Sequence, residues 1–138
     1  MTEEAIIGRF GLPPRADDVP EIRRTLAAAC ELAHDADTLA MKALCVLLFA
    51  FGAVEDSLAI WRAKRSSFDA GCSIDVQLLC GAGYAITLGY LRTLTTDEAR
   101  EALAYLEKCD AAGDFEGHDE PGSRLSEVVP AYRAYLGI

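Results

Sequence analysis

The stretch from Ala43 to Phe51 constrains the fold more than any other part of the chain, because all nine of its residues are apolar. As a helix it has no polar face, and such a helix is either buried on every side or spans a membrane. It is too short to span a bilayer, which takes about 20 mostly apolar residues. The sequence therefore predicts a central helix inside a helical core, with Leu44, Leu47, Leu48 and Phe51 fully buried.

Length and charge narrow the class of protein further. A chain of 138 residues fits one domain with a substantial core, here residues 1–138, with a short N-terminal segment at 1–16 and an acidic loop at 113–123. A formal net charge of -9 repels phosphate backbones, so we expect no nucleic-acid partner. The hydrophobic share of 51% is high for a small soluble domain. Some apolar surface is therefore expected to face a partner or a second copy.

The cysteines and the N-terminus favour a cytoplasmic protein without a membrane segment. The N-terminus lacks the basic region and apolar core of a secretory signal. The apolar stretch 76–91 contains three glycines and is shorter than a usual membrane span. The cysteine count is odd and no C-x-x-C pair occurs, which indicates reduced thiols. The five are Cys30, Cys45, Cys72, Cys80 and Cys109.

Start and stop signals along the chain predict an all-α fold of about six helices. Asp37 is a candidate N-cap of the central helix, and Gly52 is suited to the left-handed conformation that ends it. The run Thr95–Glu98 has the capping-box pattern, so a helix is expected from about Asp97 to Ala112. Strand-like alternation is absent. The other full helices are expected from near 19, at 55–65, from 74 and at 84–94. Shorter helical segments are expected at 3–9, of one or two turns, and at 124–136, with a break before Pro130; residues 66–73 are expected to form a loop.

A faint repeat suggests stacked helical hairpins. Ser57–Arg62 recurs thirty positions later as Thr87–Arg92. The spacing of Met41, Leu44, Cys45, Leu48, Gly52, Ser57 and Trp61 resembles that of a tetratricopeptide (TPR) repeat, over about one repeat. The sequence departs from that pattern at Met41, where the motif usually has Trp, and at Lys64, where it has a small residue. The resemblance implies antiparallel hairpins, either in a right-handed TPR/HEAT-like stack or in an irregular bundle, and a concave face that binds protein.

One stretch concentrates chemically active side chains. Residues 61–75 bring three basic residues into an otherwise acidic chain, beside aromatic, thiol and carboxylate groups. The basic residues are suited to receive a carboxylate or phosphate, although cations in the last turn of a helix also stabilise its dipole. The candidate binding residues are Trp61, Arg62, Arg65, Phe68, Asp69, Cys72 and Asp75.

No catalytic or metal-binding constellation emerges from the rest of the chain. Cys72 near a helix start is a possible nucleophile, but its base would have to be His34 or His118, both distant in sequence. No two Cys or His residues have zinc-ligand spacing. The run His118–Glu120 lacks the regular spacing of a calcium loop. We therefore expect no metal and no cofactor, and the catalytic residues stay unknown.

Two functions remain open. The first is a non-catalytic protein-interaction module of helical-repeat type, whose acidic surface suits a basic partner, as in small acidic inhibitors or immunity-type proteins. Its excess apolar surface also predicts a homodimer formed near the central or C-terminal hairpins. The alternative is a small enzyme or ligand-binding protein that uses the Arg62–Asp75 region. A pocket flanked by Trp61 and Phe68, with Cys72 at its floor, would favour this alternative.

Overall fold

The computed structural model describes all residues, 1–138, and contains only helices, turns and loops. The all-α class is therefore confirmed. The chain has eight α-helices, where about six were expected, and three short 3-10 helices. The α-helices are α1 (Glu3–Phe10), α2 (Val19–Glu31), α3 (Thr38–Phe51), α4 (Asp56–Arg65), α5 (Phe68–Ser73), α6 (Tyr84–Thr93), α7 (Asp97–Ala111) and α8 (Val128–Leu136). The 3-10 helices are η1 (Ala16–Asp18), η2 (Ala33–Asp35) and η3 (Val76–Cys80).

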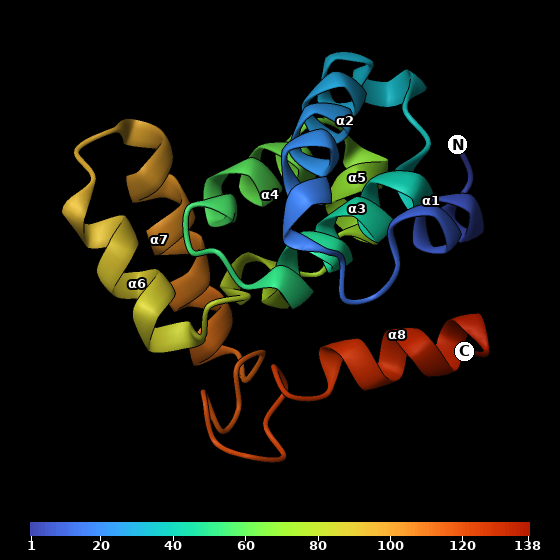
Figure 1. Cartoon of the computed structure of the whole chain (residues 1–138). Coiled ribbons are helices and arrows are strands. Elements are labelled where there is room, and N and C mark those ends of the chain that lie inside the picture. Colours follow the sequence, from blue (N-terminus) through green and yellow to red (C-terminus); the bar gives the residue numbers. More distant parts are fainter.

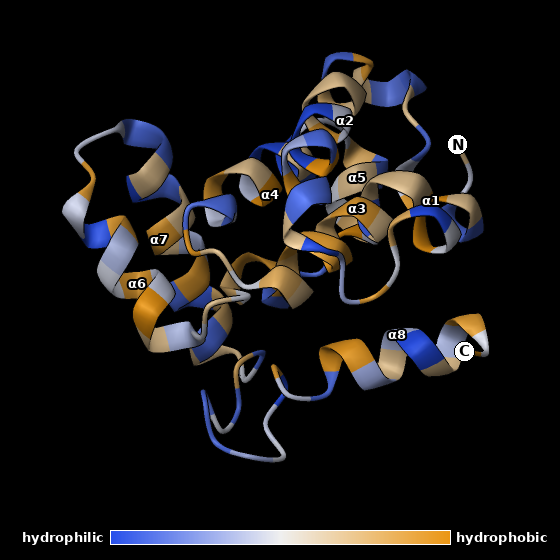
Figure 2. Ribbon diagram, viewed as in Figure 1, coloured by the Kyte–Doolittle hydropathy of each residue, from blue (hydrophilic) through white to orange (hydrophobic).

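Helix α3 lies at the centre of this arrangement. Helices α1, α2 and α5 and the 3-10 helix η3 pack around it, and α4 connects this group to α7 (Figure 1). Helices α6 and α7 lie side by side at one end of the molecule. Helix α8 follows a long connection and lies against the opposite part of the core, near α1 (Figure 1). Hydrophobic residues run through α3, whereas α2 carries a hydrophilic face (Figure 2).

The ends of α3 follow the sequence signals. The Asp37 carboxylate accepts hydrogen bonds from the backbone N–H groups of Leu39 (3.1 Å) and Ala40 (3.0 Å). Gly52 ends the helix in the left-handed region, with φ 85° and ψ 18°. Every residue from Ala43 to Leu48 is buried, which confirms the predicted central helix.

The prediction for Phe51 is wrong, because its side chain is 39% exposed. Burial declines along the last turn of α3: Phe49 and Ala50 are only partly buried, and Phe51 is exposed. The run of apolar residues in the sequence is therefore longer than the buried part of the helix.

The prediction of a loop at residues 66–73 is also wrong, since α5 occupies most of it. The Ser67 hydroxyl accepts a hydrogen bond from the Ala70 N–H at 3.0 Å and caps the helix. At the other end, Lys64 Nζ donates to the carbonyl oxygens of Gly71 (2.7 Å) and Ile74 (2.5 Å). Burial lowers the pKa of this lysine. A capping serine and a long-range lysine contact thus stabilise a helix of six residues whose composition resembles a loop. The helix expected from Ile74 is replaced by η3.

The acidic loop at 113–123 is fixed to the fold by one carboxylate. Asp119 accepts hydrogen bonds from the backbone N–H groups of Tyr84 (2.6 Å) and Ala85 (3.2 Å), so it caps α6 from 34–35 residues away in sequence. His118 stacks on the Tyr84 ring, with centroids 4.5 Å apart, and Phe115 is fully buried beside it. The loop therefore has a defined path toward α8.

Burial of α3 predicts a large cost for shortening its side chains. Leu48→Ala should reduce the free energy of unfolding by about 2–5 kcal/mol, because it removes buried methyl groups and leaves a cavity. The control is Ile86→Ala, at a position 61% exposed, where a change within about 0.5 kcal/mol is expected. Urea unfolding followed by circular dichroism measures both. Equal effects at the two positions would show that α3 is not central.

Substitution by alanine should have opposite effects on stability at two glycines. A Cβ atom at Gly81 would lie 2.7 Å from the backbone oxygen of Phe49, so Gly81→Ala should destabilise by about 1–3 kcal/mol. Gly89 lies within α6 and a Cβ atom there meets nothing within 4 Å. Gly89→Ala should therefore stabilise the protein by about 0.4–1 kcal/mol. The same unfolding measurement would contradict the packing of η3 on α3 if Gly81→Ala proved neutral.

Candidate functional site

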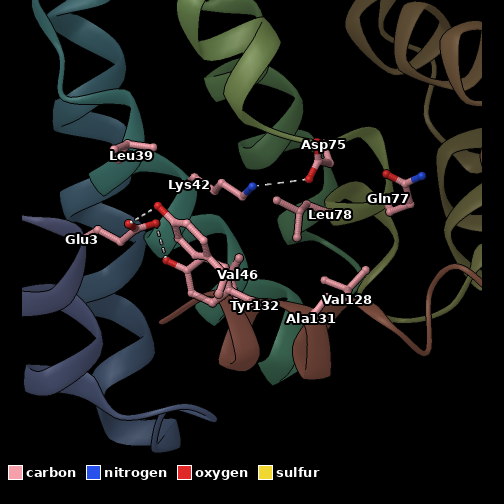
Figure 3. A pocket seen from close by; sticks show the side chains of 11 residues that line it. Glu3, Leu39, Lys42, Val46, Asp75, Gln77, Leu78, Val128, Ala131 and Tyr132 are labelled. Atoms are coloured by element: carbon pink, nitrogen blue, oxygen red, sulfur yellow. Dashed lines mark hydrogen bonds and ion pairs between the residues drawn. The ribbon is translucent and has the colours of Figure 1, made fainter. Parts of the chain in front are cut away.

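The candidate site is a pocket of about 290 Å³ between α1, α3, η3 and α8 (Figure 3). Its surface is mostly apolar, with polar side chains at two ends. Its apolar lining residues are Leu39, Val46, Leu78, Val128, Ala131, Tyr132 and Tyr135, and its polar ones are Glu3, Lys42, Asp75 and Gln77. The pocket forms only in the folded chain, because these residues come from the first, middle and last parts of the sequence.

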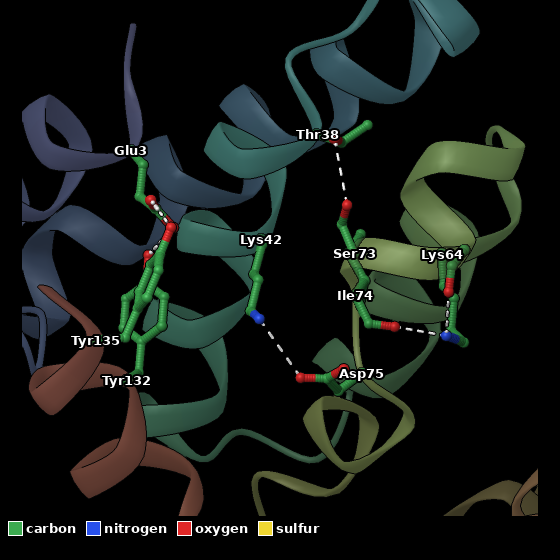
Figure 4. Close-up of polar contacts among 10 residues, drawn as sticks. Glu3, Thr38, Lys42, Lys64, Ser73, Ile74, Asp75, Tyr132 and Tyr135 are labelled. Carbon is green, nitrogen blue, oxygen red and sulfur yellow. Dashed lines mark hydrogen bonds and ion pairs between the residues drawn. The ribbon is translucent and has the colours of Figure 1, made fainter.

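At one end, Glu3 places a carboxylate where little water reaches it. Glu3 is the first residue of α1, whose N-terminus is capped by the Thr2 hydroxyl, and it is 4% exposed. Its oxygens accept hydrogen bonds from the hydroxyl groups of Tyr132 (2.9 Å) and Tyr135 (3.1 Å), both on α8 (Figure 4). No Lys, Arg or His nitrogen forms an ion pair with it. Glu3 is thus a buried acidic group that is hydrogen-bonded but has no positively charged partner.

The two tyrosines are held in their protonated form. Burial raises the pKa of Tyr132, and its hydrogen bond to Glu3 raises it further. The pKa of Tyr135 is raised chiefly by its own hydrogen bond to Glu3. The rings lie 5.9 Å apart and tilted, and Tyr135 is 62% exposed. Both phenols therefore act as donors to the carboxylate, while one ring stays accessible from solvent.

The other end of the pocket contains an ion pair. Lys42, on α3, points across the pocket, and its Nζ lies 3.5 Å from Oδ2 of Asp75 (Figures 3 and 4). The Gln77 amide is already engaged, since it donates to the backbone oxygen of Asp114 at 2.8 Å. With two carboxylates and one ammonium group, the pocket carries a formal charge of about -1 when all three are ionised.

The basic residues predicted to receive an anion are paired within the protein instead. Arg62 donates to both carboxylate oxygens of Glu98, at 2.8 and 2.6 Å, and this contact raises the pKa of Arg62. Arg65 lies 3.7 Å from Glu101 and 5.2 Å from the centre of the Trp61 ring. Trp61 itself is 4% exposed. These side chains line one shallow hollow and connect α4 to α7.

The remaining predicted residues lie elsewhere. Phe68, Asp69 and Cys72 are exposed on α5, and Phe68 is 84% exposed. Asp75 alone lies in the pocket described above. The structure therefore divides the seven predicted residues among three places and does not bring Trp61, Phe68 and Cys72 around a common pocket.

The two histidines have contacts of their own. His118 lies 2.9 Å from Asp110 and His34 lies 3.5 Å from Asp35. All five cysteines are free, with Cys72 exposed and Cys30 partly buried. Burial raises the pKa of Cys45 and of Cys80, the latter to about 12. The structure places no three His, Cys, Asp or Glu side chains together in a way that would hold a metal ion.

Comparison of the chain with models of known families, with curated proteins and with solved structures finds no match. None of the helices has both the length and the apolar character needed to cross a membrane. The geometry of the site is therefore the basis for a functional proposal.

Sequence reasoning missed most of the pocket. Lys42 is the only charged residue between Asp37 and Glu55. A single charge on an otherwise apolar helix is a sequence signal that indicates a candidate site residue. Tyr132 and Tyr135 are three residues apart and so share a helix face. Nothing in the sequence pairs Glu3 with residues about 130 positions away.

The contact between Glu3 and Tyr132 predicts a pH dependence. The pKa of Tyr132 is higher in the folded than in the unfolded chain, so its stabilising effect is complete below pH about 10 and is lost as the pH rises above that value. Tyr132→Phe should lower stability at pH 8 by about 1–3 kcal/mol, and the variant should lose less stability between pH 9 and 11 than the parent.

Urea unfolding at several pH values measures this effect. Tyr90→Phe, at a half-buried tyrosine of α6 outside the pocket, is the control and should keep the parent's pH dependence. A Tyr132→Phe variant with the parent's full alkaline loss of stability would contradict the assigned role of this hydroxyl.

Proposed function

We propose that the chain is a small ligand-binding protein and that its ligand occupies the pocket between α1, α3, η3 and α8. The observation that carries the proposal is the combination of an apolar lining with a buried Glu3 carboxylate that has no ion-pair partner, at one end of the pocket. Ligand pockets are typically roughly 300–1,000 Å³, apolar in most of their lining, with a few well-placed polar groups. At about 290 Å³ this pocket suits a small ligand.

The burial of a carboxylate supports a functional role over a purely structural one. Removing a charged group from water is costly unless an opposite charge compensates it. Glu3 has only two neutral hydroxyl donors, so its position is not explained by an internal ion pair. A few polar groups that converge on a concave, mostly apolar site are typical of a binding site.

The proposed pocket belongs to the ligand-binding alternative predicted from the sequence, but it lies at a different place from the Arg62–Asp75 region. Of the residues predicted from the sequence, only Asp75 lines the pocket, while Arg62 and Arg65 are paired with α7. The resemblance to a TPR hairpin remains a prediction. It favours a scaffold of packed hairpins that presents a groove, which is compatible with a pocket on one side of α3.

Filling the pocket should abolish binding. Ala131 is a small, exposed residue of α8 that lines the pocket, so Ala131→Trp places a large side chain in the cavity. The matched control is Ala134→Trp, on the same helix, exposed and outside the lining. The probes are three small molecules of one shape and different charge: 2-phenylethylammonium, 2-phenylethanol and phenylacetate.

Binding is measured by backbone amide shifts in nuclear magnetic resonance. We expect at least one probe to shift the amides of Val46, Leu78 and Ala131 in the parent and in Ala134→Trp. Ala131→Trp should remove those shifts while keeping the helical circular dichroism. If none of the probes shifts these amides, or if Ala131→Trp binds as well as the control, the pocket is not a ligand site.

A second candidate function is self-association, and a different surface favours it. Phe68 on α5 is 84% exposed and Leu32 at the end of α2 is 57% exposed. Helix α5 lies beside η2, which directly follows Leu32, so the segments that carry these two residues are neighbours in the fold. Exposed apolar residues gathered in this way are typical of protein contacts. A homodimer through this surface would bury both.

Light scattering at micromolar concentration tests the homodimer. The parent should be a dimer, and Phe68→Ser should dissociate it. Ile86→Ser, at a position of α6 that is also exposed, is the control. A parent whose light scattering gives a single 14.9 kDa species would exclude the homodimer.

A further inference from the structure

The charges around the pocket decide which ligand it suits, provided that the pocket is a ligand site as proposed above. Three ionisable groups that are charged near neutral pH line it: the carboxylates of Glu3 and Asp75 and the ammonium group of Lys42. Lys42 and Asp75 already pair with each other at 3.5 Å. Glu3 has no such partner, so the unbalanced charge of the pocket is negative and lies at the end formed by α1 and α8 (Figure 4).

The surroundings of Glu3 fit a cation better than a water molecule or an anion. Its carboxylate is fixed in position by the hydroxyl groups of Tyr132 and Tyr135, at 2.9 and 3.1 Å. The electron-rich faces of aromatic rings attract organic cations, and the tyrosine whose hydroxyl donates to this carboxylate, Tyr135, has an exposed side chain. Ionic hydrogen bonds in a partly desolvated site are stronger than those between neutral groups.

The rest of the pocket suits the apolar part of a ligand. Val46, Leu78 and Val128 line it between the two polar ends, and they offer no hydrogen-bond donor or acceptor in their side chains. A bare metal ion would leave this surface without a partner and would find one carboxylate where a hard cation prefers several oxygen ligands.

We infer that the ligand of this pocket is an organic monocation, with an ammonium group that contacts Glu3 and Tyr135 and an apolar body that lies along Val46, Leu78 and Val128. An anionic ligand would meet the unpaired carboxylate of Glu3, and the only cation available to it would have to leave Asp75. A neutral ligand would fill the apolar part but would leave the Glu3 charge uncompensated.

The three probes used for the pocket also test this inference. 2-Phenylethylammonium should bind at least about tenfold more tightly than 2-phenylethanol, because only the ammonium group brings a positive charge to the Glu3 carboxylate. Phenylacetate should bind more weakly than the alcohol. Increasing the salt concentration should weaken binding of the ammonium compound and leave that of the alcohol nearly unchanged.

The variant Glu3→Gln tests whether the preference for a cation comes from Glu3. Glu3→Gln removes the charge, keeps one oxygen that accepts a hydrogen bond from one tyrosine, and places an NH2 group that can donate to the hydroxyl oxygen of the other. It should reduce the affinity for 2-phenylethylammonium about tenfold, to that of the alcohol, while the affinity for the alcohol stays the same. Glu4→Gln is the matched control, because Glu4 is the neighbouring acidic residue of α1, is exposed, and does not line this pocket. It should change neither affinity by more than about twofold.

The outcomes separate the two proposals. If the alcohol or phenylacetate binds in the pocket as tightly as the ammonium compound, the inference about charge is wrong and the pocket remains a ligand site. The same holds if Glu3→Gln and Glu4→Gln weaken ammonium binding equally. If none of the probes binds, both proposals fail. The comparison of the three probes on the unmodified protein decides the charge preference even if Glu3→Gln does not fold.

Discussion

The structure depends on the burial of α3, a helix that has almost no polar surface. Its residues from Ala43 to Leu48 are covered on every side, and burying each large apolar side chain contributes roughly 1.5–3 kcal/mol. Since a helix of this kind cannot lie at the surface of a soluble domain, other elements must surround it. Helices α1, α2 and α5 and the 3-10 helix η3 do so. The one charged residue of α3, Lys42, lies on the side where this cover is incomplete, and there the pocket forms.

The same incomplete cover explains why α8 is part of the site. Helix α8 is held mainly by side chains: Tyr132 and Tyr135 donate to Glu3, and Arg133 donates to the backbone oxygen of Leu12. Through these contacts the last helix is fixed to the first one. The pocket lies between α8 and the core, so the polar contacts that position α8 are also the contacts that orient the Glu3 carboxylate. Stability of the C-terminal part and formation of the site therefore depend on the same few residues.

Local signals predicted the helices well and the site poorly, for one physical reason. The cap at Asp37 and the stop at Gly52 act within a few residues, so they can be found in the sequence. The capping-box pattern Thr95–Glu98 also indicated the start of α7, although the hydroxyl that caps the helix belongs to Thr96. Helix α5 could not be predicted because its stability comes partly from Lys64. The position of the acidic loop could not be predicted because Asp119 caps α6, which is distant in sequence. The residues predicted to form one cluster at 61–75 lie apart in the structure, because Arg62 and Arg65 form ion pairs with carboxylates on α7. The pocket combines residues 3, 42, 75 and 132, which only the tertiary fold brings together.

Because the pocket lies between α8 and the core, binding of the proposed ligand would be coupled to the docking of α8. A ligand that contacts both Glu3 on α1 and the tyrosines of α8 binds only when α8 is in place, because two of its contacts belong to that helix. Any ligand that binds one conformation and not another increases the population of the first by its binding free energy. Without a ligand, the docked arrangement must compensate for a buried carboxylate with two hydroxyl donors. A cation at Glu3 removes that cost, so the chemistry that selects the ligand would also stabilise the helix that encloses it.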